Sequence, residues 1–166
     1  MVKVGTNVAA IPPLSGADTF KVALSSSYPD PPSTMLIDQE FPVSAEVQLL
    51  GGLGEGQRTT ANVCSPGTDV DINQKLAKKH CNNSASKTFH KDNWVKVEVV
   101  VNSNKIIKHI VEGDTVLTYT NLKIGGDRVP SNYIAKIGES LGEGYISLQS
   151  EGHPVEFRNI KVKEIR

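Results

Sequence analysis

Apolar and polar residues alternate along two stretches of the chain. In the first stretch the apolar positions are Val43, Ala45, Val47 and Leu49, and the positions between them are Ser44, Glu46 and Gln48. In the second stretch, residues 94–101, valine occupies every odd position from 95 to 101, and Lys96 and Glu98 lie between them. A period of two is typical of a strand with one face on a core. Both stretches are therefore predicted to be half-buried strands.

The second stretch opens a series of strands separated by turn residues. Asn102-Ser103-Asn104 and Glu112-Gly113-Asp114 flank a predicted strand at residues 105–111, and another strand is expected at residues 115–120. This spacing predicts an antiparallel meander. Residues 121–142 are expected to form a long loop, followed by strands at residues 145–151 and 155–165. In the last strand Phe157 and Ile160 have opposite parity, so a β-bulge near Arg158-Asn159 would put both into the core.

The first forty residues are irregular by comparison. Pro12-Pro13 and Pro29-Asp30-Pro31-Pro32 interrupt any period, so only short strands fit, at residues 20–24 and near residues 2–10. A loop-rich insertion runs from the glycines after residue 50 to about His90, with a short helix expected near residues 72–79. The chain shows no βαβ rhythm and no repeat. We predict one all-β sandwich domain over residues 1–166, of which residues 1–40 are the irregular part.

The charge balance argues against some classes of partner. The chain has 18 basic and 18 acidic residues and no basic block, whereas phosphate-tracking surfaces need clustered Lys and Arg. No nucleic-acid partner is therefore expected. No stretch approaches the roughly 20 apolar residues of a membrane span, so no membrane span is expected. The N-terminal residues also lack an apolar signal core, so export is not encoded in this sequence itself.

The two cysteines give information about the cellular compartment of the protein. Cys64 and Cys81 lie in one polar stretch. They are either two free thiols or a disulfide that closes a short loop, which the chain-entropy estimate values at about 3 kcal/mol. Their position in a loop favours the disulfide. A disulfide would indicate an oxidising compartment, extracellular or periplasmic.

The alternation also predicts a polar sheet face. If Val47 and its apolar neighbours face the core, Glu46 and Gln48 face outward, and in residues 145–151 the outward positions are Tyr145, Ser147, Gln149 and Glu151. Carboxylates, amides and an aromatic ring suit a sugar, whose hydroxyl groups need paired donors and acceptors. The alternative is an ordinary solvated face.

Several segments resemble one protein family in the family's own order. The segment LQSEGHPVEFRNI at residues 148–160 resembles the C-terminal signature of the 3-keto-disaccharide hydrolase domain family. Similar to further family motifs are FPVSAEVQ (residues 41–48), NVCSPGT (residues 62–68) with the later His80-Cys81, WVKVE (residues 94–98) and IKHIVEG (residues 107–113). In the last motif Glu112 replaces the usual asparagine. The resemblance spans residues 41–165 and implies a concanavalin A-like jelly roll, often on secreted bacterial proteins.

The resemblance also implies site residues and an activity on 3-keto-glycosides. The catalytic candidates are Glu46, His109, Glu151 and Arg158. Glu151 or His109 would be the base, Glu46 the partner acid or a sugar ligand, and Arg158 the stabiliser of an enolate. The candidates for substrate binding are Gln48, Tyr145, Gln149 and His153. The structural alternatives are an ion pair of Arg158 with Glu156 or Glu46, a half-buried His109 with satisfied hydrogen bonds, and a Trp94 that packs rather than binding sugar.

No metal site is predicted. Residues 69–73 begin like a calcium loop, but Gln74 stands where that loop needs glycine and His80 where it needs its terminal glutamate. The sequence leaves any cofactor unknown.

The family has more strands before the Glu46 segment than residues 1–40 supply. The jelly roll is therefore expected to be shortened at the N-terminus. Such a sandwich would expose sheet edges, and we expect it to form a homodimer.

Three functions remain open. The first is an enzyme acting on oxidised sugars, which requires the four catalytic candidates to converge around one cavity. The second is a non-catalytic carbohydrate-binding module, and the third is an assembly domain.

Overall fold

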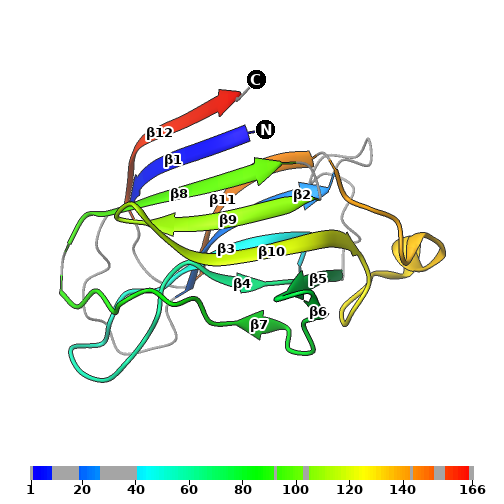
Figure 1. Cartoon of the computed structure of the whole chain (residues 1–166), viewed down its shortest axis with the longest axis horizontal. Helices are drawn as coiled ribbons and strands as arrows, with labels where there is room; N and C mark the ends of the chain where they lie inside the picture. Colours follow the sequence, from blue (N-terminus) through cyan, green and yellow to red (C-terminus); the bar gives the residue numbers. More distant parts are fainter. Residues whose placement is uncertain are drawn as a thin grey trace.

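The computed structural model describes residues 2–8, 19–26, 41–91, 93–102, 105–142, 144–151 and 156–164. These residues form two antiparallel β-sheets that pack as layers (Figure 1). The seven-stranded sheet has the order β12 (Phe157–Glu164), β1 (Val2–Val8), β8 (Val95–Asn102), β9 (Ile106–Val111), β10 (Asp114–Ile124), β5 (Thr68–Ile72) and β6 (Lys75–Leu76). The five-stranded sheet has the order β11 (Gly144–Glu151), β2 (Thr19–Ser26), β3 (Ser44–Leu49), β4 (Asn62–Cys64) and β7 (Cys81–Asn82).

The predicted strand pattern is largely present. β8, β9 and β10 are consecutive neighbours, which confirms the meander. The strands expected in the first forty residues are present as β1 and β2, and each lies inside a sheet. β1 pairs with both β8 and β12, and β2 pairs with both β3 and β11. The first and last strands of the chain therefore lie side by side (Figure 1).

The predicted bulge in β12 is also present. The register against β1 shifts between the Gly5–Lys161 and Asn7–Arg158 pairs, and Asn159 has a positive φ of 56°. The bulge adds one residue to β12, as the parity argument required. The expected burial of Ile160 was wrong, since this side chain is 45% exposed. β12 is an edge strand, so correct parity did not bring Ile160 under the other layer.

Two local predictions were wrong. Instead of a helix at residues 72–79, β5 and β6 form a hairpin whose turn residues Asn73 and Gln74 have φ of 52° and 62°. Two successive residues with positive φ match the twist of a tight hairpin, and asparagine tolerates that conformation. The expected loop over residues 121–142 begins with the end of β10 and contains the 3-10 helix η2 (Ser131–Lys136).

The core lies between the two sheets. Its buried apolar side chains are Val43, Ala45, Val47, Leu49, Ala61, Val63, Val70, Val95, Val97, Val99, Ile107, Val111, Tyr119, Leu122, Ile124 and Leu141. Both alternating stretches of the sequence thus supply the core with their odd positions. No helix in the described part of the chain is long and apolar enough to cross a membrane.

Candidate functional site

One face of the five-stranded sheet carries polar residues in register. Glu46 pairs with Cys64, which pairs with Cys81, and Gln48 pairs with Asn62. Directly paired residues of neighbouring strands lie on the same face. We call this surface the polar face; its described side chains are Ser44, Glu46, Gln48, Asn62, Cys64 and Cys81.

The register extends this face to β11. Gln149 pairs with Lys21 and Lys21 with Gln48, so Gln149 belongs to the row of Gln48. Tyr145 and Glu151 have the same parity on β11 and pair with Ser25 and Thr19. The backbone therefore gives these residues positions on the polar face. His153 lies outside the described residues.

The polar face is covered at β3. Ser44 and Glu46 are 0% exposed, although their neighbours Ala45 and Val47 face the core. β3 is the middle strand of its sheet, and the loop after β4 lies along its start. The Pro66 carbonyl accepts from the Ser44 N–H at 3.1 Å, and the Thr68 hydroxyl donates to the Ser44 carbonyl at 2.7 Å. The parity predicted for Glu46 was right, but its predicted exposure was wrong.

A polar network fixes the amide groups of this face. The Thr59 hydroxyl donates to Asn62 Oδ1 at 2.8 Å, and the Ser84 N–H donates to the same oxygen at 2.9 Å. Asn62 Nδ2 donates to the Thr59 carbonyl at 3.1 Å and to Gln48 Oε1 at 3.3 Å. The Asn62 amide is thus held in one orientation and aligns Gln48 beside it.

Hydroxyl groups hold the segment after β7 against the segment that precedes β4. The Thr60 N–H donates to Ser86 Oγ at 2.7 Å, and Ser86 Oγ donates to the Thr60 carbonyl at 3.0 Å. Two residues further on, Thr88 Oγ1 accepts from the Arg58 N–H at 2.7 Å. Hydroxyl oxygens of side chains here form the hydrogen bonds with backbone N–H and C=O groups that a neighbouring strand would form in a sheet. The loop-rich insertion is therefore anchored next to the polar face.

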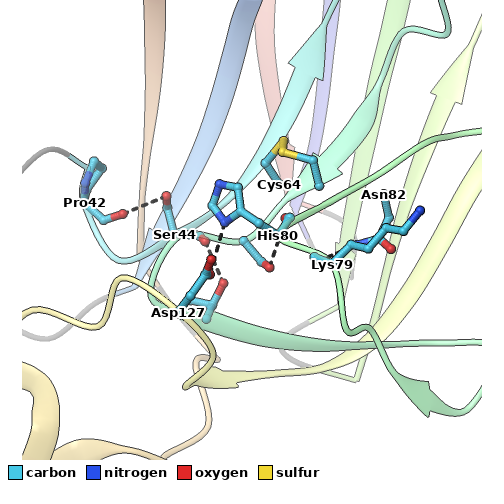
Figure 2. Close-up of polar contacts among 10 residues, drawn as sticks. Pro42, Ser44, Cys64, Lys79, His80, Asn82 and Asp127 are labelled. Atoms are coloured by element: carbon cyan, nitrogen blue, oxygen red, sulfur yellow. Dashed lines mark hydrogen bonds and ion pairs between the residues drawn. A yellow bond between two sulfur atoms is a disulfide. The ribbon is translucent and has the colours of Figure 1, made fainter.

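At one end of the polar face lie a disulfide and a histidine–aspartate pair. Cys64 and Cys81 are bonded, with their Cα atoms 4.1 Å apart. The next residue back, His80, has Nδ1 3.3 Å from Asp127 Oδ1 (Figure 2). Figure 2 shows the His80 ring between Ser44 and Cys64, with its other nitrogen directed away from Asp127. The His80 side chain is 23% exposed.

His109 lies in the core rather than on the polar face. It is 0% exposed on β9, in register with Val99 of β8. Its Nδ1 lies 2.8 Å from the Ala61 carbonyl, which only accepts, so Nδ1 carries the hydrogen. Nε2 is then the acceptor for the Tyr119 hydroxyl at 3.2 Å. Burial lowers the pKa of His109 to about 4, against a smaller opposing effect of the Ala61 hydrogen bond.

Arg158 lies on the other layer. It pairs with Asn7, which pairs with Lys96, the exposed residue between buried Val95 and Val97. This row is the outer face of the seven-stranded sheet. The Arg158 guanidinium stacks on the Trp94 ring at 3.7 Å from its centroid, so Trp94 has a packing partner on that face. Glu46 belongs to the polar face, His109 to the core and Arg158 to the outer face of the other sheet. The expected convergence of the four catalytic candidates around one cavity therefore does not occur.

The rejected calcium loop has structural roles. Asp71 accepts from Asn121 Nδ2 at 2.6 Å. Asp69 lies so close to Gly125 that a Cβ there would be 2.3 Å from the carboxylate. Among the described residues, no group of three or more His, Cys, Asp or Glu side chains is arranged to hold a metal ion.

His80 and Asp127 were not predicted to form a pair. They are 47 residues apart, and only His80 occurs in a segment that resembles a family motif. The available signals were the position of His80 next to Cys81 and that of Asp127 after Gly125-Gly126. Only the topology brings these two loops together.

Fold and face together define a two-layer antiparallel β-sandwich domain with a row of amide, hydroxyl and carboxylate groups on one sheet. The chain belongs to the 3-keto-alpha-glucoside-1,2-lyase-like domain family, whose model matches residues 26–163. The match includes β3 to β11 and all but the last residue of β12, and it confirms the resemblance seen in the motifs. Membership implies a carbohydrate-active role. No curated protein and no solved structure matched the chain.

Proposed function

We propose that the domain acts on 3-keto-glycosides and breaks the glycosidic bond by base-assisted elimination followed by hydration. The observation that carries this proposal is the family match over residues 26–163, which contains most of the polar face. The finer fold that we propose with it is a concanavalin A-like jelly roll.

The chemistry follows from the substrate class. A ketone at C3 acidifies the C2 proton, because the electrons left behind are delocalised onto the carbonyl oxygen. A base removes this proton, the C1–O bond breaks, and the leaving oxygen is protonated. Water then adds across the new C1=C2 bond. The reaction needs a base, an acid for the leaving group and hydrogen bonds to the enolate oxygen.

The polar face offers groups for a sugar. Gln48 is half-buried and fixed by Asn62, so its orientation is set before a ligand arrives. The register adds positions Tyr145, Gln149 and Glu151 to the same face. We propose that these residues contact the sugar and that Glu151 transfers a proton to the leaving oxygen. Glu46 and His109 are buried, so we assign them no direct contact with substrate.

The test is incubation of the chain with a 3-keto-disaccharide, following release of the free sugar. The native chain should release it, and Glu151→Gln should reduce release by about 100-fold or more, the usual worth of a positioned acid or base. Lys75→Arg is a control, because Lys75 is exposed on β6, at the edge of the other sheet. No release by the native chain would overturn the proposed reaction.

A second function is favoured by one observation. Glu46 and His109, two of the four catalytic candidates, are both 0% exposed. A carbohydrate-binding module needs only the amide and hydroxyl groups of the polar face, without an accessible acid and base. Calorimetric binding of the 3-keto-disaccharide without its cleavage would favour this function over the enzyme.

The location and assembly of the domain are also proposals. The Cys64–Cys81 disulfide supports an extracellular or periplasmic site, since such bonds persist in oxidising compartments. For homodimer formation, the support is apolar side chains on the two edge strands β11 and β12: Ile146, Leu148, Ile160 and Val162, which are 38%, 42%, 45% and 61% exposed. Light scattering at high concentration that gives the mass of a monomer would overturn the homodimer.

A further inference from the structure

His80 and Asp127 form a pair whose backbone is fixed on both sides. On the His80 side, its carbonyl accepts from the Ser65 N–H at 2.9 Å, and the next residue is bonded to Cys64 through the disulfide. The imidazole is therefore carried on a segment tied both covalently and by hydrogen bonds to β4. Such a segment cannot move away without breaking the disulfide or unpairing the strand.

Asp127 is fixed by the neighbouring loop. Its carbonyl accepts from the Gly67 N–H at 2.9 Å, and the Gly67 carbonyl accepts from the Gly125 N–H at 3.1 Å. Gly126 lies so near β5 that a Cβ there would be 3.0 Å from the Thr68 carbonyl. Gly67 and Gly126 also have positive φ values of 66° and 71°, so both positions favour glycine. The two loops thus hold Asp127 opposite the ring.

The pairing defines which nitrogen of His80 is available. A carboxylate only accepts hydrogen bonds, so Nδ1 carries the hydrogen that points to Asp127 Oδ1. The lone pair of a neutral imidazole is then on Nε2. Figure 2 shows that nitrogen on the side of the ring away from Asp127. A carboxylate that orients an imidazole in this way also stabilises the imidazolium formed when Nε2 takes a proton.

The His80–Asp127 ion pair itself adds little stability. The Asp127 side chain is 61% exposed, and an exposed ion pair contributes only about 0–1 kcal/mol. A disulfide, two loops and two glycines nevertheless hold the pair in place. Fixing an imidazole and its carboxylate partner on a rigid support is what proton transfer requires.

We propose that His80 Nε2 is the base that removes the C2 proton of a 3-keto sugar, with Asp127 as its positioning residue. This inference rests on the proposed function and names a base for it. In the step, the Nε2 lone pair takes the C2 proton, the C2–H electrons form a C2=C3 bond, and the carbonyl π electrons move to the C3 oxygen. The enolate then either regains a proton at C2 or expels the C1 substituent, with formation of the C1=C2 bond and return of the C3 carbonyl.

The first branch gives a test that does not depend on cleavage. 3-Keto-glucose, the probe, is incubated with the oxidised protein in D2O, and loss of the C2 proton signal is followed by NMR above the buffer rate. The native chain should accelerate exchange, and His80→Gln should slow it by about 100-fold or more. Asp127→Asn should lower the maximal rate by about 10- to 100-fold and leave the half-saturating concentration unchanged. His90→Gln is the matched control, since His90 accepts from Gly54 away from the pair.

The outcomes separate this inference from the proposed function. Exchange that needs His80, without cleavage of a 3-keto-disaccharide, supports the base and overturns the proposed reaction. Cleavage that is unchanged in His80→Gln supports the reaction and overturns the base. Absence of exchange with the native chain, or exchange lost in Glu151→Gln but kept in His80→Gln, also overturns it. Thermal unfolding of each variant shows whether the fold is intact, and Asp127→Asn provides the second variant if His80→Gln does not fold.

Discussion

Two histidines of this domain have similar hydrogen bonds but opposite surroundings. His109 lies in the core with both ring nitrogens engaged, and it is 0% exposed. His80 lies in the loops at the end of the polar face, uses Nδ1 for Asp127, and its side chain is 23% exposed. The first imidazole joins the two layers through Ala61, and the second faces solvent beside the disulfide. The family motif contains His109, but burial makes it a structural residue.

The largest expected difference between the two regions is in stability. His109→Ala should lower the free energy of unfolding by about 4 kcal/mol, because it leaves a cavity and removes the partner of the buried Ala61 carbonyl and Tyr119 hydroxyl. His80→Ala should cost less than about 1 kcal/mol. Urea unfolding of both variants measures this contrast. Equal losses would mean that His80 is as structural as His109.

Removal of the disulfide tests the loop region alone. Cys64 and Cys81 are separated by 17 residues, and a loop of this size corresponds to about 3 kcal/mol. Cys64→Ala with Cys81→Ala should therefore lower the free energy of unfolding by about this amount. It should also slow C2 exchange, because His80 loses its anchor. C2 exchange at the native rate in the double variant would show that the position of His80 does not depend on the disulfide.

Acid should destabilise the core region. The pKa of His109 is lowered to about 4 in the folded chain, against about 6.5 for an unfolded histidine. The unfolded state therefore binds more protons between these values, and stability decreases as the pH falls through this window. Between pH 7 and pH 5 the loss from this group should be about 2 kcal/mol.

His109→Gln should remove the part of this pH dependence due to His109, which is measured by urea unfolding at each pH. Its unfolding free energy should vary less between pH 7 and pH 5 than that of the native chain. A slope equal to that of the native chain would contradict the assignment.

The smallest effects concern the partners of the two rings. Tyr119→Phe removes the hydroxyl that donates to His109 Nε2 and should cost about 1 kcal/mol. Asp127→Asn should change stability by less than about 0.5 kcal/mol while slowing exchange. Urea unfolding of the two variants measures both losses of unfolding free energy. A larger loss for Asp127→Asn than for Tyr119→Phe would contradict the structural role given to His109 and the functional role given to His80.

The sequence predicted what depends on local parity. The odd valines of β8 and the apolar set of β3 face the core, and the bulge in β12 follows from the opposite parity of Phe157 and Ile160. Parity also identified the polar face around Glu46. These features depend on which face of a strand each residue occupies. The alternation of neighbouring residues in the sequence determines the face.

Local parity could not predict which side chains are buried by the rest of the fold or which distant residues come together. Glu46 is 0% exposed although its parity turns it away from the core, and Ile160 is 45% exposed on the edge strand β12 although its parity turns it toward the core. Both depend on pairings between distant parts of the chain. The His80–Asp127 pair depends likewise on the segment before β7 and the loop after β10, which meet only in the folded domain.

The pairing of β1 with β12 has a consequence for how the domain is made. β1 is held on one side by β8 and on the other by the last strand of the sheet, so its backbone stays half unpaired until the C-terminal segment has been synthesised. Pairings of such high sequence separation form slowly. The nascent chain should therefore expose the unpaired edge of β1 to chaperones or to other chains until β12 has been synthesised.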